Sequence, residues 1–170
     1  MSKNLILIGP MGAGKSSIGK RLAKQLKRSF FDCDRVLEER TGVAITTIFE
    51  LEGEGGFRQR ETKILEELMQ HDNVVIATGG GAVLRPENQK LLCLNSVIIF
   101  LQASVETQIK RTRQDKKRPL LQTEDRHATL QALAKSRNPI YDDLANITVN
   151  TDKQNISSSV ETIISKLNNL

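Results

Sequence analysis

Gly9-Pro10-Met11-Gly12-Ala13-Gly14-Lys15-Ser16, the sequence GPMGAGKS, has the GxxxxGKS spacing of a phosphate-binding loop. An apolar run, Leu5-Ile6-Leu7-Ile8, precedes it and is typical of a parallel strand buried on both faces. After the loop, apolar residues recur at helical spacing, namely Ile18, Leu22, Ala23 and Leu26. The motif therefore joins a buried strand to an amphipathic helix, which is the context that it requires.

The residue types of this loop suit phosphate chemistry. Gly12 and Gly14 let the backbone curl so that successive N–H groups point into one concavity, to which the helix adds its positive end. Lys15 can reach the β- and γ-phosphates, and the Ser16 hydroxyl is placed to bind Mg²⁺. The loop predicts a nucleotide site, and a glycine-rich turn that matches by chance is the alternative.

Length and composition indicate an ordinary globular protein. The 170 residues suit one domain, and 38% hydrophobic with 26% charged residues is far from the composition of disordered chains. The longest apolar candidate, Val97–Leu101, is much shorter than the ~20 residues that span a bilayer, and the N-terminal run is too short for a signal peptide. We therefore expect a cytoplasmic protein with no membrane partner.

Cysteines and charge exclude further classes. Cys33 and Cys93 lie far apart without metal-ligand spacing, so we expect both to be reduced core residues. The net charge of +5 could suggest nucleic acid, but aromatic residues make up 4% and no RNP-like or zinc-finger pattern occurs. Anionic small molecules explain the charge more simply. No long apolar surface stripe is left over, so we expect a monomer.

Two carboxylates end the second predicted strand, Phe30–Asp34. Because side chains alternate along a strand, Asp32 and Asp34 should point the same way and Cys33 into packing. Ligands of open parallel sheets bind at the carboxyl ends of the strands, so one aspartate can serve Mg²⁺ and the other an acceptor hydroxyl. The alternative is that one of them caps the next helix, Val36–Arg40.

The middle of the chain is rich in glycine. A helix over Ile45–Leu51 should be interrupted by a hinge at Gly53–Gly56 and resume from Phe57 to about Gln70. The third strand, Val74–Thr78, ends in Gly79-Gly80-Gly81. Three glycines at the end of a buried strand predict that something approaches the backbone closely.

Two arginines occupy positions where a cation needs a partner. Arg58 falls in the first turn of its predicted helix, where the helix dipole disfavours it, so it either binds an anion or pairs with Glu54 or Glu61. Arg137 continues the apolar stripe of Leu130, Leu133 and Ala134, and must find an anion or a cavity.

The rest of the chain completes an alternating pattern and a lid. Expected elements are a helix from Pro86 to about Leu94, strands Val97–Leu101 and Ile147–Val149, a helix capped by Ser104 that runs to about Arg113, a helix that ends or bends at Asn138-Pro139, and a closing helix over 156–167. Between Arg111 and Thr123 the chain is basic and loses its apolar period, with Arg113, Lys116, Lys117 and Arg118. We interpret this segment as a flexible lid whose arginine closes over a transferring group, and a solvated charge run is the alternative.

Taken in order, these motifs resemble shikimate kinase. They are GPMGAGKS, FFDCD at Phe30–Asp34, Gly53-Glu54-x-x-Phe57-Arg58-x-x-Glu61, Gly79-Gly80-Gly81, Arg118-Pro119-Leu120-Leu121 and Arg137-Asn138-Pro139-x-Tyr141. The resemblance covers nearly the whole chain. Cys33 departs from it, because the family often has a small hydroxyl residue there.

The resemblance implies an α/β fold, a P-loop three-layer α/β/α sandwich with a five-stranded parallel sheet in the order 2-3-1-4-5, as one domain over 1–170. It implies a helical substrate-binding region at about 34–60 and a lid at about 112–124. It also implies phosphorylation of shikimate by ATP to shikimate 3-phosphate, a step toward chorismate and the aromatic amino acids, with one Mg²⁺ per subunit.

The resemblance assigns residues as well. ATP would contact Gly12, Ala13, Gly14, Lys15, Ser16, Ser17, Arg118 and Gln154. Ser16 would ligate Mg²⁺, helped through water by Asp32. Shikimate would contact Asp34, Arg58, Gly79, Gly80, Gly81 and Arg137, and the catalytic residues would be Lys15, Asp34 and Arg118.

The residue types lead independently to a similar acceptor. Two arginines favour a carboxylate and a lone aspartate favours hydroxyls, so the substrate should be a small carboxylated polyol. Lys15, Mg²⁺ and Arg118 are assigned to the phosphoryl oxygens, while Asp34 either orients or deprotonates the attacking hydroxyl. Competing hypotheses are a gluconate or nucleoside monophosphate kinase on the same fold, a nucleotide-dependent switch, although no NKxD-type sequence occurs, and a nucleic-acid-binding protein.

Overall fold

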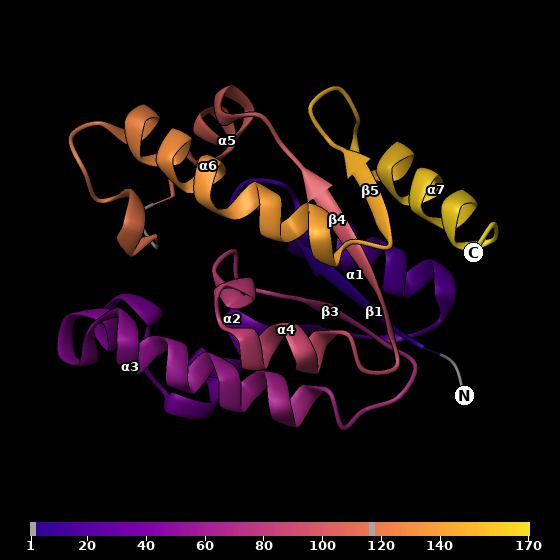
Figure 1. The fold of residues 1–170 in the computed structure, drawn as a ribbon, viewed down its shortest axis with the longest axis horizontal. Coiled ribbons are helices and arrows are strands. Elements are labelled where there is room, and N and C mark those ends of the chain that lie inside the picture. The colour runs from indigo at the N-terminus through magenta and orange to yellow at the C-terminus, as the bar shows by residue number, and fades with distance from the viewer. Residues whose placement is uncertain (1–2, 116–117) are drawn as a thin grey trace.

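A parallel β-sheet organises the molecule (Figure 1). The computed structural model describes residues 3–115 and 118–170. In these residues five strands pair in the order β2-β3-β1-β4-β5, as predicted. Their bounds are β1 Asn4–Ile8, β2 Ser29–Asp32, β3 Val74–Ala77, β4 Ser96–Gln102 and β5 Ile147–Asn150, and every neighbouring pair is parallel.

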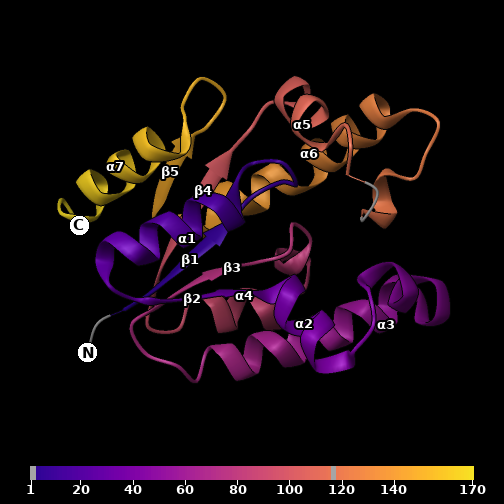
Figure 2. The ribbon, with the colours of Figure 1, turned by 180° about the vertical axis from the view of Figure 1, so that it is seen from behind.

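Helices cover both faces of the sheet. Their bounds are α1 Lys15–Leu26, α2 Cys33–Thr41, α3 Ile45–Leu68, α4 Pro86–Leu92, α5 Val105–Thr112, α6 Arg126–Leu144 and α7 Ile156–Leu167, with short 3₁₀ turns at Ala82–Leu84 (η1) and Pro119–Leu121 (η2). Figure 1 shows α3, α4 and α6 in front of the sheet, and Figure 2 shows α1 and α7 in front of its other face. The three-layer α/β/α sandwich is therefore confirmed.

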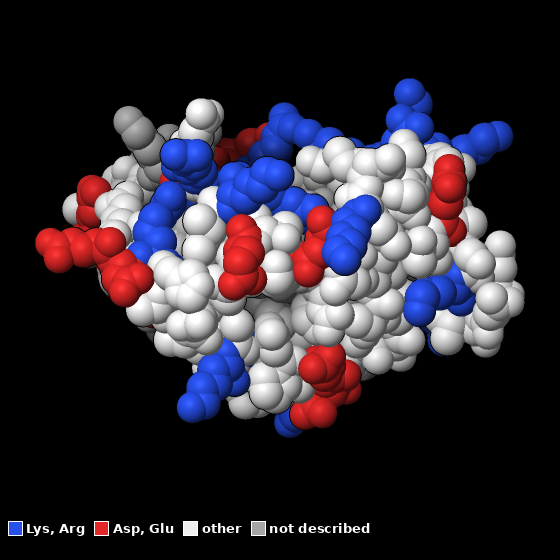
Figure 3. All heavy atoms as spheres, turned by 90° about the horizontal axis from the view of Figure 1, so that it is seen from above, with Lys and Arg blue, Asp and Glu red and all other residues white. Residues whose placement is uncertain are grey.

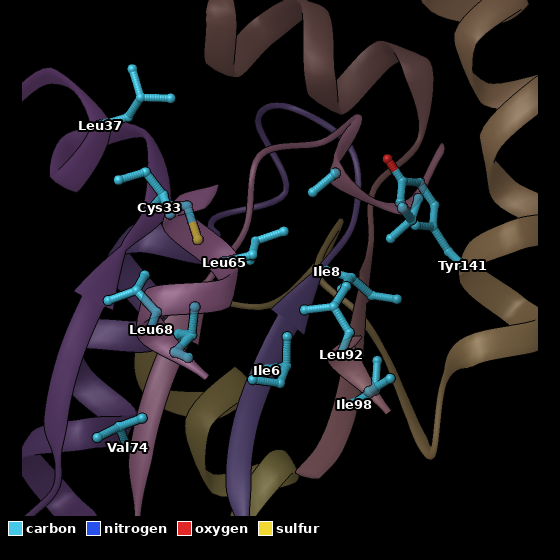
Figure 4. Packing of buried hydrophobic residues seen from close by; sticks show 14 of the residues in the cluster. Ile6, Ile8, Cys33, Leu37, Leu65, Leu68, Val74, Leu92, Ile98 and Tyr141 are labelled. Carbon is cyan, nitrogen blue, oxygen red and sulfur yellow. The ribbon is translucent and has the colours of Figure 1, made fainter. Parts of the chain in front are cut away.

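The central strand β1 serves both layers because successive side chains alternate. Ile6 and Ile8 lie in one apolar cluster with Leu65 and Leu92 (Figure 4), whereas Leu7 joins a second cluster with α1 and α7. Burial on both faces explains why the residues of β1 after Asn4 are all apolar. None of the helices in the described ranges is long and apolar enough to cross a membrane.

The second strand is shorter than predicted. β2 ends at Asp32, and α2 begins at Cys33 instead of Val36, because the Asp32 carboxylate caps the helix by accepting the Arg35 N–H at 3.3 Å. Strand alternation therefore does not orient Asp34, which lies in the first turn of α2. The expected helix cap exists, at Asp32, and Cys33 is buried as expected.

Two helices differ from the prediction. α3 contains the predicted interruption, as a kink at Gly53 with φ 68° and ψ −176°, but its second piece starts directly after Gly53 instead of at Phe57, so Arg58 lies beyond the first turn. α6 continues past Pro139 to Leu144, although proline removes one helical hydrogen bond. Its last turns are held by Tyr141, whose ring packs on Phe100 with centroids 5.0 Å apart.

The prediction that both cysteines lie in the core is wrong for one of them. Both cysteines are free, but Cys93 is exposed at the end of α4 and does not belong to the core. The buried residues of that helix, Asn88 and Leu92, are four positions apart, and the residue after Leu92 already faces solvent.

Candidate functional site

The phosphate-binding loop forms between β1 and α1, where the sequence predicts it. Gly9, Gly12 and Gly14 have φ of 140°, 77° and 96°, conformations that a residue with a side chain adopts at a cost. Lys15 Nζ donates to the carbonyl oxygens of Gly9 at 2.7 Å and Pro10 at 2.9 Å, so it lies across the loop.

The surroundings of the Lys15 side chain make its charge state depend on a nearby anion. Burial, together with the nearby positive charge of Arg118, lowers the pKa of Lys15 to about 7, and Asp34 and Asp32 offset part of that effect. A phosphate group beside Nζ would favour the charged form, so binding an anion and protonating Lys15 are coupled.

Ser16, at the start of α1, and Asp32, at the end of β2, form an oxygen pair. The Ser16 hydroxyl donates to Asp32 Oδ2. Both line a pocket, here called the phosphate pocket, formed by Gly12, Gly14, Lys15, Ser16, Ser17, Asp32, Asp34, Thr78 and Arg118. Mg²⁺ prefers hard oxygen ligands and is commonly held by one or two protein oxygens plus phosphates, so this donor set fits it.

A second cavity adjoins the phosphate pocket. This acceptor cavity has a volume of about 490 Å³ including space open to solvent, and is lined by Met11, Asp34, Ile45, Phe49, Phe57, Arg58, Glu61, Gly79, Gly80, Gly81, Arg118, Pro119, Leu120 and Arg137. Asp34, Arg58 and Arg137 come from three different helices, and the fold brings them to one cavity wall. The convergence expected from the sequence is thus present.

Arg58 forms the ion pairs that were the alternative to anion binding, and its place in the cavity wall leaves anion binding as a proposal. Its guanidinium donates to Glu61 at 2.9 Å and to Glu54 at 3.1 Å, and it also lines the acceptor cavity. The paired Glu61 side chain is buried, and burial raises the pKa of Glu61 despite the opposing charge of Arg58. Both Arg58 Nε and Glu61 Oε1 are buried without a hydrogen-bond partner among the described residues.

The three glycines after β3 leave room for these side chains. A Cβ on Gly79 would lie 2.5 Å from Glu61 Oε1, and one on Gly81 would overlap the Arg58 guanidinium. Gly80 has only ordinary contacts, but its carbonyl accepts the Tyr141 hydroxyl at 2.5 Å. The groups that approach the backbone closely are therefore Glu61 and Arg58.

Arg137 differs from Arg58 in its pairing. It is 5% exposed, and no carboxylate in residues 3–115 or 118–170 lies within salt-bridge distance of it. Its positive charge acts on Tyr141, partly opposing the burial that raises the pKa of that phenol to about 12. A buried arginine without a carboxylate is suited to bind an anionic ligand.

Asp34 and Arg118 lie where the two pockets meet. Each lines both the phosphate pocket and the acceptor cavity, and Arg118 Nη1 is 3.9 Å from Asp34 Oδ2. Burial and repulsion from Asp32 raise the pKa of Asp34, while Arg118, Lys15 and Arg58 oppose the shift. A carboxylate at this boundary can face both an acceptor hydroxyl and the γ-phosphate.

The predicted lid is partly described. Arg118 also pairs with Asp115 at 3.1 Å, and η2 buries Leu121 against Met11 and Leu130. Lys116 and Lys117 lie outside the described residues. At least the part from Arg118 to Leu121 is therefore packed on the site, which a fully solvated charge run would not be.

The sequence analysis missed a set of hydrogen bonds that joins Arg111 and Thr151 to the phosphate-binding loop. Arg111 donates to Gly12 O at 3.0 Å and to Thr151 O at 2.6 Å, and the Thr151 hydroxyl donates to Ala13 O at 3.2 Å. Gln154 lines a groove here with Gly14, Ser17, Arg111, Thr151 and Asn155. Residues this far apart in the chain carry no local signal of their contact; only the polar character of a buried position, Thr151, could have hinted at it.

Charges of both signs surround the site. Figure 3 shows Lys and Arg side chains gathered across the upper half of the face that looks onto the carboxyl ends of the strands, with Asp and Glu between and below them. This mixed surface differs from the continuous basic stripe typical of a nucleic-acid-binding protein.

The fold and the two adjoining pockets define a P-loop kinase that acts on a small anionic acceptor. The shikimate kinase family model matches residues 11–168. This chain belongs to the shikimate kinase family.

Individual relatives agree with that assignment. A shikimate kinase from Actinobacillus pleuropneumoniae serotype 5b is 52% identical over 168 residues, covering 99% of this chain and 97% of the relative. One from Legionella pneumophila strain Corby is 50% identical over 165 residues, covering 97% and 94%. Membership of the family confirms the prediction, made from the sequence, of an ATP-dependent shikimate kinase of aromatic biosynthesis.

Solved structures show the same fold. Shikimate kinase from Acinetobacter baumannii in complex with shikimate has a TM-score of 0.96 at 41% identity, with 98% of this chain and 93% of that one covered. A gluconokinase from Sinorhizobium meliloti has a TM-score of 0.67 at 18% identity, covering 99% and 93%, and shares the fold alone.

Proposed function

We propose that this chain transfers the γ-phosphoryl group of ATP to a hydroxyl of shikimate bound in the acceptor cavity, giving shikimate 3-phosphate and ADP. The observation that carries the proposal is that Asp34 and Arg118 line both pockets, so the donor and acceptor sites share one boundary. The Acinetobacter baumannii relative was solved in complex with shikimate, a small carboxylated polyol of the kind that this cavity suits.

The nucleotide phosphates bind the loop. Backbone N–H groups of Gly12–Ser17 surround them, and Lys15 exchanges its bonds to Gly9 O and Pro10 O for phosphate oxygens. Ser16, with Asp32 acting through water, would hold one Mg²⁺, which supplies charge neutralisation at the β- and γ-phosphates when bound. The groove that contains Gln154 takes the base end of the nucleotide.

The acceptor is held by charge and shape. Arg137, which has no carboxylate partner among the described residues, and Arg58 bind the substrate carboxylate, while the backbone of Gly79–Gly81 lies against its ring. Met11, Phe49 and Phe57 supply the apolar part of the wall. Arg58 stays in place because Glu54 and Glu61 hold it.

Asp34 positions the hydroxyl and accepts its proton. Its raised pKa makes it a better base than an ordinary aspartate, because proton transfer improves as the pKa of the base approaches the working pH. Arg118 and Lys15 place positive charge where the transferring phosphoryl oxygens lie.

Three further features belong to the proposal. Residues of about 34–60 form the substrate-binding region, and residues of about 112–124 act as a lid within a single domain. The enzyme works in the cytoplasm, in keeping with its two free thiols, and as a monomer, which light scattering would test.

Steady-state ADP release tests the function. The chain is incubated with ATP, Mg²⁺ and, separately, shikimate, gluconate or a nucleoside monophosphate. We expect turnover with shikimate to exceed that with the other acceptors by several orders of magnitude. Comparable turnover with gluconate would reassign the acceptor, and turnover that does not depend on any acceptor would favour a nucleotide-dependent switch.

A further inference from the structure

The acceptor cavity is built from both sides of a break in α3. Ile45 and Phe49 line it from before the break at Gly53, and Phe57 and Arg58 line it from after. The width of the cavity therefore depends on how the two pieces of α3, 45–52 and 54–68, are held relative to each other.

The break itself requires glycine. Gly53 has φ 68° and ψ −176°, a backbone region that is essentially restricted to glycine. A Cβ there would meet nothing within 4 Å, so the requirement is conformational and not steric. Backbone geometry at one residue leaves the angle between the pieces free to vary unless contacts across the break fix it.

An ion pair crosses the break on its exposed side. Arg60 donates from Nε to Glu52 Oε2 at 2.9 Å and from Nη2 to Glu52 Oε1 at 2.6 Å, which is a bidentate arrangement. In an unbroken helix residues eight apart are separated by about 12 Å along the axis, beyond the reach of such a pair. Glu52 therefore folds back along the second piece of the helix.

A second glycine makes room for that fold. A Cβ on Gly56 would lie 2.5 Å from Glu52 Cβ and 3.0 Å from Glu52 Oε2. Gly55, its neighbour in sequence, has nothing within 4 Å of the same position. The Glu52 side chain therefore packs directly against Gly56, whereas a side chain at position 55 would have open space.

On the cavity side, aromatic rings join the same two pieces. Phe49 and Phe57 pack with centroids 4.7 Å apart, and both line the cavity. The ion pair and the ring pair both bridge the break, and their members lie three residues apart within each helix piece (Phe49 and Glu52, Phe57 and Arg60). Loss of the ion pair leaves the ring pair as the remaining bridge, so the wall formed by Ile45 and Phe49 can move away from Arg58.

From this geometry we infer that Glu52 and Arg60 are positioning residues for the acceptor: their bidentate pair over Gly56 sets the angle of the break in α3 and so the affinity for the acceptor. Neither residue lines the cavity. The inference rests on the proposed function for the identity of the acceptor, but not for the geometry.

Two matched substitutions test it. Glu52→Gln removes the charge, with Glu50→Gln, an exposed glutamate of the same helix piece, as its control. Gly56→Ala displaces the Glu52 side chain, with Gly55→Ala as its control, because both changes add the same helix propensity. We expect Glu52→Gln and Gly56→Ala to raise the KM for shikimate roughly two- to fivefold, the range of an exposed ion pair, with the KM for ATP unchanged. The two controls should change neither.

A double-mutant cycle distinguishes a specific interaction between Glu52 and Arg60 from a general loosening of α3. If the two residues act as a unit, Arg60→Gln adds nothing to the KM for shikimate once Glu52→Gln is present. Additive effects, equal effects in the controls, or a parallel rise in the KM for ATP would overturn the inference. Absence of shikimate-dependent turnover in the unsubstituted enzyme would instead overturn the proposed function, so the two failures are distinguishable.

Discussion

The Arg118 guanidinium lies 3.9 Å from the Asp34 carboxylate, and the two side chains separate the phosphate pocket from the acceptor cavity. Opposite charges at this boundary hold each other in place before substrates bind. When a γ-phosphate and an acceptor hydroxyl enter, Arg118 can turn to the phosphate oxygens and Asp34 to the hydroxyl. In the proposed reaction, breaking the pair is part of forming the reactive complex, and it gives each of the two charges a ligand partner.

Asp34→Asn should lower kcat by about 100-fold or more while the free energy of unfolding is kept or slightly raised. The folded-state pKa of Asp34 is raised, so its ionisation costs stability, and this cost grows as the pH climbs above 3.8 through the raised pKa. Asparagine removes that cost. Thermal unfolding at pH 7 should show an unchanged or higher Tm, where ~1 kcal/mol corresponds to about 2–4 °C. Unchanged turnover would show that Asp34 has no part in the reaction.

Lys15→Ala should abolish turnover and leave the fold intact, because Lys15 is the cation that lies across the phosphate-binding loop. Turnover by ADP release and far-UV circular dichroism are the measurements. Near-normal activity in this variant would refute the assignment of the loop.

Nucleotide binding should take up a proton at alkaline pH. The pKa of Lys15 is about 7, so most of the free protein carries a neutral Lys15 at a pH of about 8.5, and phosphate binding restores the charge. Calorimetric titration with ATP in buffers of different ionisation enthalpy should show uptake of close to one proton. Lys15→Arg, always charged, should take up none; equal uptake in both proteins would contradict the lowered pKa.

The framework of the molecule could be predicted because its signals are local. The apolar runs of β1, β3 and β4 and the glycines of the phosphate-binding loop determine the sheet and the nucleotide site without reference to distant residues. The order of the sheet came from family resemblance, since strand neighbours leave no local mark in a sequence.

The errors arose where local rules compete with distant contacts. Proline predicts that α6 ends or bends at Asn138-Pro139, and of these alternatives the end is wrong, because the helix continues to Leu144 with Tyr141 anchored to Phe100 and Gly80. The alternation of side chains along a strand predicted that β2 reaches Asp34. In the structure Asp32 caps α2, so the strand ends two residues earlier. Arg111 and Thr151 were missed because their contacts cross between loops.

Alanine substitutions in the triple glycine should destabilise the fold in the order Gly81, Gly79, Gly80. The new Cβ overlaps the Arg58 guanidinium at position 81, lies 2.5 Å from Glu61 Oε1 at position 79, and meets nothing closer than 3.5 Å at position 80. Overpacking of this kind costs about 1–3 kcal/mol, which urea unfolding resolves. Gly81→Ala should also raise the KM for shikimate by displacing Arg58. An equal loss of stability at all three positions would show that close approach of the Arg58 and Glu61 side chains does not account for the glycines.

Arg137→Ala should mainly weaken binding of the acceptor. A hydrogen-bonded charge contributes about 1.5–3 kcal/mol, so the KM for shikimate should rise about 10- to 100-fold, with the KM for ATP little changed. Arg137→Lys should be intermediate, because lysine keeps the charge and loses the bidentate geometry.

Stability distinguishes this role from a structural one. Arg137 is buried without a carboxylate partner in the described part of the chain, so its removal should leave the free energy of unfolding unchanged or higher, whereas a structural arginine would lower it. Lys135→Ala, an exposed cation on the same helix, is the matched control. Tyr141 is the single tyrosine of a chain without tryptophan, and its hydroxyl binds Gly80 O beside the cavity, so its fluorescence can follow acceptor binding directly. An unaltered affinity for shikimate in Arg137→Ala would exclude contact with the carboxylate.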